Sequence, residues 1–591
     1  MRTGTSSKHE AQRAGRPPAR GRHRMAVFVV ALAAIGALCA GTAAAAPADQ
    51  RSRATAKAAA VTVPRDPMAA VARMQPGWNL GNTFDAIPDE TSWGNPLTTK
   101  ATFDGLRAQG FRSVRIPVTW YPHQSDTAPY AIDPTWMKRV KQVVDWALED
   151  GLYVEINVHH DSWQWIADMS TDHDKVMARF KATWQQIATT FKDEPRALLM
   201  ESINEPQFNN ATDAQKTQYL RELNTAFHDV VRASGGQNKD RLLVLPSEET
   251  NSAQHWLDDL STTMTGLRDR NLVATVHYYS WYPFSVNIAG GTTYDATSQK
   301  DLTDGFARVH DTFAAKGIPV YVGEVGLLTS PYSGVVERGE MLKYYEHLTY
   351  EARRSGFTTA LWDAANDFLN RGTMQWMVPE MEALMKTSWT TRSGTASTDN
   401  VFLPASGALT AQTLTLNPNG QTFTGLWEGD RELTSGSDYT LDGDRLTLTA
   451  DALTRLAGDR AHGVNATLEI RYSAGVPWKL FIRSYDKPVL SNATGTLDGL
   501  TIPTRFNGAL MANVESTYAD GTAAGPASWT TFQSFDNYRA DYSANTTTVK
   551  PDFLKSLKDD APVTLTFRFW TGDNITYTIT KSGNTVTGTT S

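Results

Sequence analysis

The sequence predicts an α/β fold, a (β/α)8 barrel, followed by two small all-β domains of the β-sandwich type. Two observations lead to this prediction. From about residue 66 to 388, short apolar runs alternate with longer amphipathic stretches, as they do in repeated βα units. Beyond about residue 400, stretches with period-2 alternation of apolar and polar residues replace the helical patterns, which is typical of half-buried strands.

Eight strand candidates divide the first part of the chain. Helical candidates such as 136–149 and 175–191 lie between them, and the first has the apolar spacing of a helix that packs on one face. Eight βα units favour a closed barrel over a doubly wound open sheet, which is the alternative. The strands are expected at 78–82, 114–118, 153–159, 198–204, 242–246, 273–279, 319–323 and 359–362.

The C-terminal part of the chain is expected to form two β modules. A segment at 389–400, rich in Ser, Thr and Gly, is the predicted linker to the first module, 401–485. That module holds a hairpin pattern around the turn Asp442-Gly443-Asp444. In the second module, 486–591, two alternating stretches are expected to pair across the turn Gly572-Asp573-Asn574.

The first 46 residues are expected to be an export signal. Five arginines between residues 13 and 24 precede a 16-residue apolar run, 25–40, and a small-residue stretch at 42–46 offers a cleavage site. The alternative is a membrane anchor, but the run is shorter than the ~20 residues that span a bilayer. We therefore expect a secreted, extracellular protein without membrane association after cleavage, with residues 47–65 as a linker.

The composition excludes several classes of function. The single cysteine, Cys39, lies inside the predicted signal, so the mature chain would have no disulfide, thiolate metal site or cysteine nucleophile. Without residues 1–46 the chain has 49 basic against 62 acidic residues. This balance argues against nucleic acid as a partner, because phosphate binding needs clustered positive charge. A monomer is the expected state.

Polar and aromatic side chains lie at or just past the C-terminal ends of the predicted strands, which converge on the active-site face of such barrels. Two are glutamates, Glu205 and Glu324, after the fourth and seventh strands. Cleavage of a glycosidic bond needs a proton donor and a second carboxylate, so this pair indicates a glycosidase. The whole set comprises Arg115, His159, Asn204, Glu205, His277, Tyr279, Glu324 and Trp362.

Six motifs in this region carry a family resemblance. In chain order they are Gly77–Thr83, Glu90–Pro96, Arg115–Trp120, Asn204–Pro206, Val276–Tyr279 and Gly323–Gly326. Together they resemble glycoside hydrolase family 5, and the first two, with Asn157–Asp161, are most similar to its subfamily 4. The resemblance covers about residues 70–385. It implies a (β/α)8 barrel with retaining endo-β-glucanase activity on cellulose, mixed-linkage β-glucan or xyloglucan.

The resemblance also implies roles for individual residues. Glu205 would be the general acid/base and Glu324 the nucleophile. Asn204 would bond the 2-hydroxyl of the sugar in the −1 subsite, while Arg115 and Tyr279 would keep Glu324 ionised and oriented. The remaining expected substrate contacts are His159 and His277 along the −1 subsite, Trp362 as its floor, and His160.

Aromatic rings near the strand ends are expected to stack on sugar faces, the alternative for each being core packing. Trp163, Trp165 and Trp281 are favoured because they follow strand ends; the other rings are Trp93, Trp120, Tyr282 and Phe368. No metal or organic cofactor is expected. The sequence has no Gly-rich phosphate cradle after a first strand, and His159-His160 lacks the clustered partners of a metal site.

The two β modules carry resemblances of their own. Residues 401–485, through Leu433–Thr440, resemble the immunoglobulin-like X2 module, which implies a spacer. Residues 490–591 resemble carbohydrate-binding module family 46 through Ile502–Gly508, Ala524–Trp529 and Phe569–Gly572. Because such a module can fold back on the catalytic cleft, Trp529 and then Trp570 are the candidate sugar platforms, with core packing as the alternative.

The expected function is that of a secreted retaining endo-β-1,4-glucanase, acting on xyloglucan, mixed-linkage β-1,3-1,4-glucan and cellulose derivatives. A cellulase or a β-mannanase of the same family is the alternative with the same chemistry. A non-catalytic glycan-binding protein is the alternative from another class, against which the presence of both Glu205 and Glu324 speaks.

Overall fold

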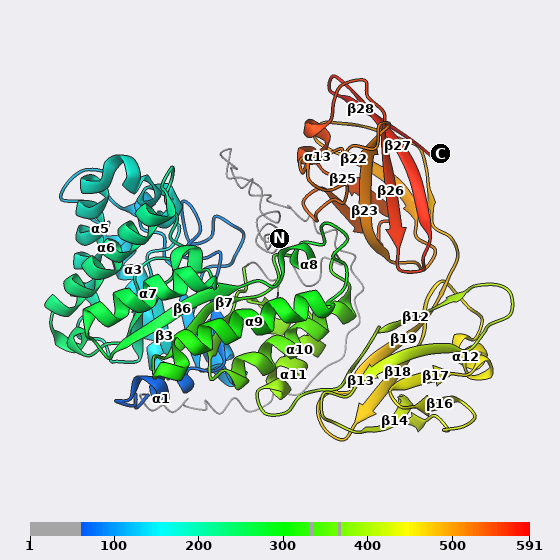
Figure 1. The fold of residues 1–591 in the computed structure, drawn as a ribbon, viewed down its shortest axis with the longest axis horizontal. Helices are drawn as coiled ribbons and strands as arrows, with labels where there is room; N and C mark the ends of the chain where they lie inside the picture. The colour runs from blue at the N-terminus through cyan, green and yellow to red at the C-terminus, as the bar shows by residue number, and fades with distance from the viewer. Residues whose placement is uncertain (1–60, 330–334, 365–367, 591) are drawn as a thin grey trace, which may run out of the picture. The chain divides into compact units, whose positions relative to one another are not determined.

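The computed structural model describes residues 61–329, 335–364 and 368–590; the predicted signal and most of the 47–65 linker lie outside them. The first domain is a closed barrel of eight parallel strands, with neighbouring strands consecutive in the sequence (Figure 1). Two small all-β domains follow, so the predicted fold class is confirmed. The barrel strands are β1 (Gly77–Asn79), β2 (Ser113–Ile116), β3 (Tyr153–Asn157), β4 (Leu198–Glu201), β5 (Leu243–Pro246), β6 (Leu272–Tyr278), β7 (Val320–Val325) and β8 (Thr358–Leu361).

Helices alternate with these strands and cover the outside of the barrel (Figure 1). Helix α3 begins after Asp133, whose carboxylate accepts the Thr135 backbone N–H, and Pro134 suits its first turn. Thr212 and Gln215 form a reciprocal capping box at the start of α6. The helices are α1 (Pro67–Ala72), α2 (Lys100–Ala108), α3 (Pro134–Glu149), α4 (Asp161–Gln164), α5 (Met169–Phe191), α6 (Asp213–Ala233), α7 (Gln254–Leu267), α8 (Tyr282–Ser285), α9 (Ala296–Thr312), α10 (Arg338–Arg354) and α11 (Pro379–Ser388).

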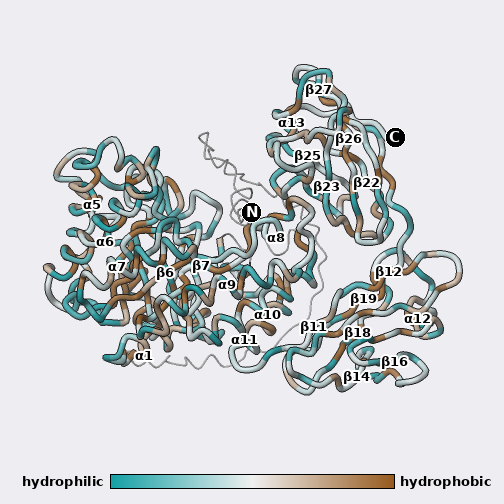
Figure 2. Tube along the Cα trace, viewed as in Figure 1, coloured by the Kyte–Doolittle hydropathy of each residue, from teal (hydrophilic) through white to brown (hydrophobic). Residues whose placement is uncertain are grey.

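The barrel buries two apolar layers. The larger lies between the strands and the surrounding helices, where Val140, Val143 and Val144 of α3 are fully buried. The smaller fills the N-terminal end of the barrel, where residues of α1 pack against interior side chains such as Leu199. Figure 2 shows hydrophobic residues concentrated around the barrel strands near β6, and more hydrophilic ones on the outer helices.

Above this apolar plug, the barrel interior is polar. Towards their C-terminal ends, the apolar strands β1 to β4 carry buried amides, a guanidinium and carboxyl groups at alternating positions: Asn79, Arg115, Glu155, Asn157 and Glu201. Since alternate residues of a strand point to the same side, these groups share the interior of the barrel. They form the support on which the site at the C-terminal ends of the strands is built.

The first β module has two sheets. One contains β11 (Thr395–Ala396), β13 (Gln412–Asn417), β17 (Arg445–Leu448) and β16 (Tyr439–Asp442) in that order; the other contains β12 (Asn400–Pro404), β19 (Trp478–Tyr485), β18 (Gly463–Tyr472), β14 (Phe423–Glu428) and β15 (Arg431–Glu432). β16 and β17 form the hairpin predicted around Gly443. Strand β11 lies within the segment expected as linker, and a short helix, α12 (Ala450–Ala457), was not expected.

The second β module has its own apolar core, which includes Ile502, Phe567 and Tyr577. Its sheets are β20 (Val489–Leu490), β22 (Leu500–Arg505), β25 (Thr546–Val549) and β24 (Tyr538–Asp541), and β21 (Ala493–Thr496), β28 (Thr585–Thr590), β27 (Asn574–Ser582), β26 (Val563–Phe569) and β23 (Met511–Tyr518), with α13 (Pro551–Ser556) beside them. β26 and β27 pair across the turn at Gly572–Asp573. No helix in the described part of the chain is long and apolar enough to span a membrane.

Candidate active site

A β-bulge positions the nucleophile candidate. Val276 of β6 pairs with Val322 of β7, but the next residue, His277, pairs with Glu324, so Gly323 is an extra residue in β7. A side chain at Gly323 would place its Cβ 3.1 Å from His277 Nε2 and from Thr275 Oγ1. Glycine therefore permits the close strand approach, and the bulge changes the direction of the Glu324 side chain.

Glu324 is 5% exposed and receives hydrogen bonds on both carboxylate oxygens. Oε1 accepts from Arg115 Nη1 at 2.7 Å, and Oε2 accepts from the Tyr279 hydroxyl. Burial, followed by the charge of Glu324, raises the pKa of Tyr279 well above its usual value, so this hydroxyl stays a donor. Each oxygen of Glu324 thus accepts a hydrogen bond, and the two bonds fix the direction of the carboxyl group.

Arg115 connects Glu324 with the interior of the barrel. Its fully buried guanidinium donates to Glu201 Oε2 at 2.8 Å and to Asn204 Oδ1 at 2.8 Å. Burial lowers its pKa, but the surrounding carboxylates more than compensate and raise it above the usual value, so the cation persists. Because Asn204 accepts with Oδ1, its Nδ2 hydrogens are left to donate to a substrate oxygen.

Glu205 has a backbone φ of 36°, a left-handed conformation that is strained for a residue other than glycine. Its side chain is 32% exposed, and Oε1 lies 2.9 Å from His277 Nδ1. The same nitrogen is 3.5 Å from Glu324 Oε2, and one oxygen of each glutamate lies within 4.8 Å of the other. Burial raises the pKa of Glu205 to about 7, which suits a proton donor.

His277 is neutral at physiological pH, because burial lowers its pKa to about 4. Its Nε2 has no hydrogen-bond partner among the described residues, so the network assigns the proton to Nδ1. The Nδ1–H then donates to Glu205 Oε1. This donor stabilises the carboxylate that Glu205 becomes after it has released its proton.

The tautomer of His159 follows from its neighbours. Asn157 Oδ1 accepts from the Val118 backbone N–H and its Nδ2 donates to Glu201, which fixes the amide orientation. Nδ2 therefore also donates to His159 Nδ1, and Nε2 carries the ring proton. The ring stacks on Trp362 at 5.8 Å with an angle of 6° between their planes. His159 is thus a donor suited to a sugar oxygen.

His160 is 7% exposed and sits between two indoles, with ring centroids 5.3 Å from Trp93 and 4.2 Å from Trp163. Asp85 Oδ2 lies 3.4 Å from its Nε2. The expectation that His159-His160 has no carboxylate partner is therefore wrong, since Asp85, His159 and His160 could group around an ion. The donor set does not suit a metal, however, because His159 Nε2 is protonated and its Nδ1 is already an acceptor.

The other aromatic candidates divide into buried and accessible rings. Trp120 and Phe368 are buried, and Trp120 Nε1 donates to the Asn157 carbonyl, so neither offers a face to a sugar. Trp281 is half-buried and precedes α8, where Tyr282 is 44% exposed. In the second β module, Trp529 is 42% exposed.

Trp570 lies elsewhere. It lines a cavity of about 260 Å³ together with Glu337 and Arg338 of the barrel domain and Arg483 of the first β module. No residue of the catalytic pair or its hydrogen-bond partners lines this cavity.

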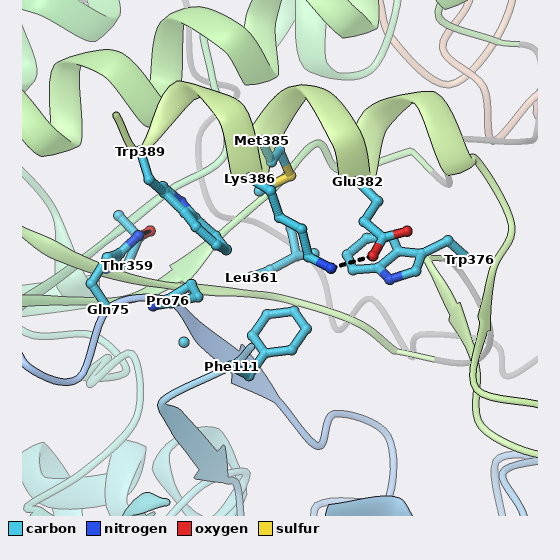
Figure 3. Close-up of a pocket in the computed structure, with 11 residues that line it drawn as sticks. Gln75, Pro76, Phe111, Thr359, Leu361, Trp376, Glu382, Met385, Lys386 and Trp389 are labelled. Carbon is cyan, nitrogen blue, oxygen red and sulfur yellow. Dashed lines mark hydrogen bonds and ion pairs between the residues drawn. The ribbon is translucent and has the colours of Figure 1, made fainter. Parts of the chain in front are cut away.

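A smaller cavity, of about 20 Å³, lies between α11 and the outside of β8 (Figure 3). Figure 3 shows Lys386 of α11 and Trp389, which directly follows that helix, on one side of it and Phe111 on the other, with an ion pair between Lys386 and Glu382. Its volume is close to that of one water molecule, so it cannot hold a sugar ring.

The polar residues that hold the site residues in place from beneath were not predicted from the sequence. Asp85, Asn79, Asn157 and Glu201 all bond to, or lie beside, predicted site residues. A signal was present for three of them, because Asn79, Asn157 and Glu201 are polar residues at inward positions of otherwise apolar strands. Asp85 lies in a loop and gave no such signal.

Comparison with known proteins agrees with this geometry. The family model of cellulases, glycosyl hydrolase family 5, matches residues 79–368. A model of the carbohydrate binding domain X2 matches residues 395–482, and one of the carbohydrate binding domain CBM46 matches 486–589.

Relatives match this chain over most of its length and nearly all of their own. Endoglucanase B of Paenibacillus lautus is 46% identical over 528 residues, covering 88% of this chain and 93% of that protein. The tri-modular endo-β-1,4-glucanase B of Bacillus halodurans has a TM-score of 0.85 at 42% identity, over 89% of this chain and 99% of that one. A tri-modular subfamily 4 endo-β-1,4-glucanase of Bacillus licheniformis, solved with cellotetraose, has a TM-score of 0.75 at 30% identity, with the same coverage. The chain therefore belongs to glycoside hydrolase family 5, as an endoglucanase with X2 and family 46 carbohydrate-binding domains.

Proposed function

We propose that the protein is a secreted, monomeric, retaining endo-β-1,4-glucanase that cleaves xyloglucan, mixed-linkage β-glucan and cellulose derivatives. The observation that carries the proposal is the pairing of Glu205 with Glu324. One is poised as a proton donor, and the other is held as an anion by Arg115 and Tyr279.

The first step would form a glycosyl-enzyme. An oxygen of Glu324 attacks the anomeric carbon, the bond from that carbon to the leaving oxygen breaks, and Glu205 gives its proton to that oxygen. Asn204 and His159 donate to oxygens of the same sugar, and Trp362 lies beneath it. His277 Nδ1–H stabilises the carboxylate left on Glu205.

The second step would release the sugar. Glu205, now ionised, takes a proton from a water molecule whose oxygen attacks the anomeric carbon, and the bond to Glu324 breaks. The spacing of the pair supports this route. Retaining enzymes keep their carboxyl groups ~5–5.5 Å apart, whereas inverting enzymes leave ~6.5–9.5 Å for a water molecule. Here the nearest oxygens lie within 4.8 Å.

Contacts between the second β module and the barrel domain support a role of that module at the cleft. The Phe535 N–H donates to the Val286 carbonyl, and Asn287 Nδ2 donates to the Ala512 carbonyl at 2.7 Å. Both barrel residues directly follow α8, next to Trp281 and Tyr282. The segment that carries Trp529 is thereby anchored beside aromatic residues that follow β6, where it can contact a long or branched glucan.

The test is release of reducing ends from xyloglucan, mixed-linkage β-glucan, carboxymethylcellulose and mannan, measured side by side with the mature protein. We expect the fastest release from xyloglucan or mixed-linkage glucan, and none from Glu324→Gln. The fastest release from mannan would overturn the substrate assignment. Undiminished release by Glu324→Gln would overturn the mechanism.

A further inference from the structure

Glu155 is a buried carboxyl group that the mechanism above does not use. It lies midway along β3, between Tyr153 in the apolar plug and Asn157 beneath the active site, and its side chain is 0% exposed. Its Oε1 is 3.2 Å from Arg115 Nε, without the geometry of a hydrogen bond. Neither Glu155 oxygen has a hydrogen-bond partner among the described residues if the group is ionised.

The neighbouring Glu201 lacks a hydrogen-bond donor for one of its two oxygens. Its Oε2 accepts three hydrogen bonds, from Arg115 Nε, Arg115 Nη2 and Asn157 Nδ2, whereas its Oε1 has no donor within the described part of the chain. Glu155 pairs with Leu199 of the neighbouring strand β4, so Glu201, two residues further along, lies diagonally beside it on the same inward face. Both carboxyl groups approach the same atom, Arg115 Nε, which is 3.2 Å from Glu155 Oε1 and 3.0 Å from Glu201 Oε2. A proton on Glu155 would satisfy both residues, because the carboxylic acid becomes the donor that Glu201 lacks.

The local charge balance leads to the same result. In the part of the chain that the structure describes, Arg115 is the one cation paired with three carboxyl groups, those of Glu155, Glu201 and Glu324. The other titratable groups around them are His159, His277, Tyr279, Tyr321 and Glu205, and burial favours the neutral form of each. Three buried carboxylates against one guanidinium would leave two negative charges uncompensated in the barrel interior, which is a large energetic cost.

We propose that Glu155 is a positioning residue that stays protonated at neutral pH and donates a hydrogen bond to Glu201, so that Arg115 divides its charge between Glu201 and the nucleophile. The proton resides on Glu155 because Glu201 already receives three donors as an anion. Burial, and then the charge of Glu201, raises the pKa of Glu155 well above its usual value, in agreement with this assignment.

The protonation state of Glu155 affects the hydrogen bond from Arg115 to the nucleophile, Glu324. An ionised Glu155 would draw the guanidinium toward the interior through its Nε, at the expense of the bond from Nη1 to Glu324. A neutral Glu155 leaves that bond intact. This inference rests on the proposed roles of Arg115 and Glu324, but its first test does not depend on activity.

The first experiment is infrared difference spectroscopy of the mature protein in ²H₂O, which separates the C=O stretch of a protonated carboxyl from carboxylate bands. We expect Glu155→Gln to remove one protonated-carboxyl band that the unmodified protein keeps at pH 8.5. Glu205→Gln is the control, since its band should fade above about pH 7. If Glu155→Gln removes no such band, Glu155 is ionised and the proposal is wrong.

The second experiment uses steady-state kinetics on an aryl β-cellobioside. Glu155→Leu leaves Glu201 without its donor and should lower kcat by about tenfold with KM unchanged, because a small displacement of Arg115 misaligns the nucleophile. Glu155→Gln, a neutral donor of the same shape, should restore most of this loss, whereas Glu201→Gln should cost more than Glu155→Gln. Equal losses in Glu155→Gln and Glu155→Leu, or the reverse order of the two Gln variants, would contradict the proposal.

Discussion

Glu205 and Glu324 are the same residue type, and their surroundings give them different tasks. Glu324 accepts hydrogen bonds from the guanidinium cation of Arg115 and from the phenol hydroxyl of Tyr279. No cation of the described residues lies within hydrogen-bond distance of Glu205, and its partner is the neutral imidazole of His277. The difference arises from β7 and β6, which supply Glu324, Tyr279 and His277 to the same place.

The pH dependence of the reaction tests the role of Glu205. The acid must be protonated for the first step, so kcat/KM should fall as the pH rises through about 7. With an aryl cellobioside whose leaving group needs no protonation, Glu205→Gln should retain formation of the glycosyl-enzyme and lose this alkaline limb. A wild-type profile that stays flat to pH 9 would contradict the assignment.

A Tyr279→Phe variant tests whether the hydrogen bond from the Tyr279 hydroxyl to Glu324 contributes to catalysis. Tyr279→Phe removes one donor to Glu324 without changing the shape of the ring. A hydrogen bond to a charged group contributes ~1.5–3 kcal/mol, so kcat should fall roughly 10- to 100-fold. The melting temperature, measured by calorimetry, should change little, and Tyr350→Phe on the outer helix α10 is a matched control. A variant with the kcat of the unmodified enzyme would show that this donor is not used.

At the scale of elements, the sequence predicts the strands well and their irregularities poorly. All eight predicted strands overlap the observed ones. In a barrel of alternating strands and helices, a short apolar run between two helical patterns is a strand. The bulge at Gly323 was not predicted, because it depends on the pairing of β7 with β6 rather than on β7 alone. The same holds for Asp85 and His160, whose proximity arises from two loops 75 residues apart in the sequence.

The bulge can be tested by Gly323→Ala. The added Cβ would lie 3.1 Å from His277 Nε2 and Thr275 Oγ1, which is too close without a displacement of β6 or β7. Because small misplacements of catalytic groups are costly, kcat should fall by about tenfold or more. Gly266→Ala is the control, since a Cβ at that helical position meets nothing within 4 Å. Equal activity of the two variants would show that the bulge does not position Glu324.

At the scale of the whole molecule, the sequence predicts three domains. In the structure, residues of the β modules contact the barrel domain. Asp399, at the start of the first β module, accepts from Arg338 of α10, and a Cβ at Gly339 would lie 2.8 Å from its Cγ. Such contacts join segments far apart in the sequence, so neither segment alone has a sequence pattern that predicts them. For the same reason the sequence ranked Trp529 before Trp570 as a sugar platform but did not predict that Trp570 lines a cavity between domains.

A Trp529→Ala variant tests whether the second β module contributes to substrate binding. If its ring stacks on a glucan chain, Trp529→Ala loses ~1–2 kcal/mol of binding, and kcat/KM on xyloglucan should fall about tenfold. The loss should be confined to polymers, because an aryl cellobioside does not extend beyond the barrel. Leu441→Ala, at a residue 40% exposed in the first β module, is the control. Equal kinetics of the two variants on xyloglucan would assign Trp529 no role in substrate binding.

The central claim is that Glu205 and Glu324 act together in a double displacement. The most direct measurement is ¹H NMR of the anomeric protons during the first minutes of cellotetraose hydrolysis, before the products mutarotate. We expect the newly formed reducing ends to appear as the β anomer and the α anomer to grow only later. Initial release of the α anomer would show a single displacement by water and would contradict the assignment of Glu324 as the nucleophile.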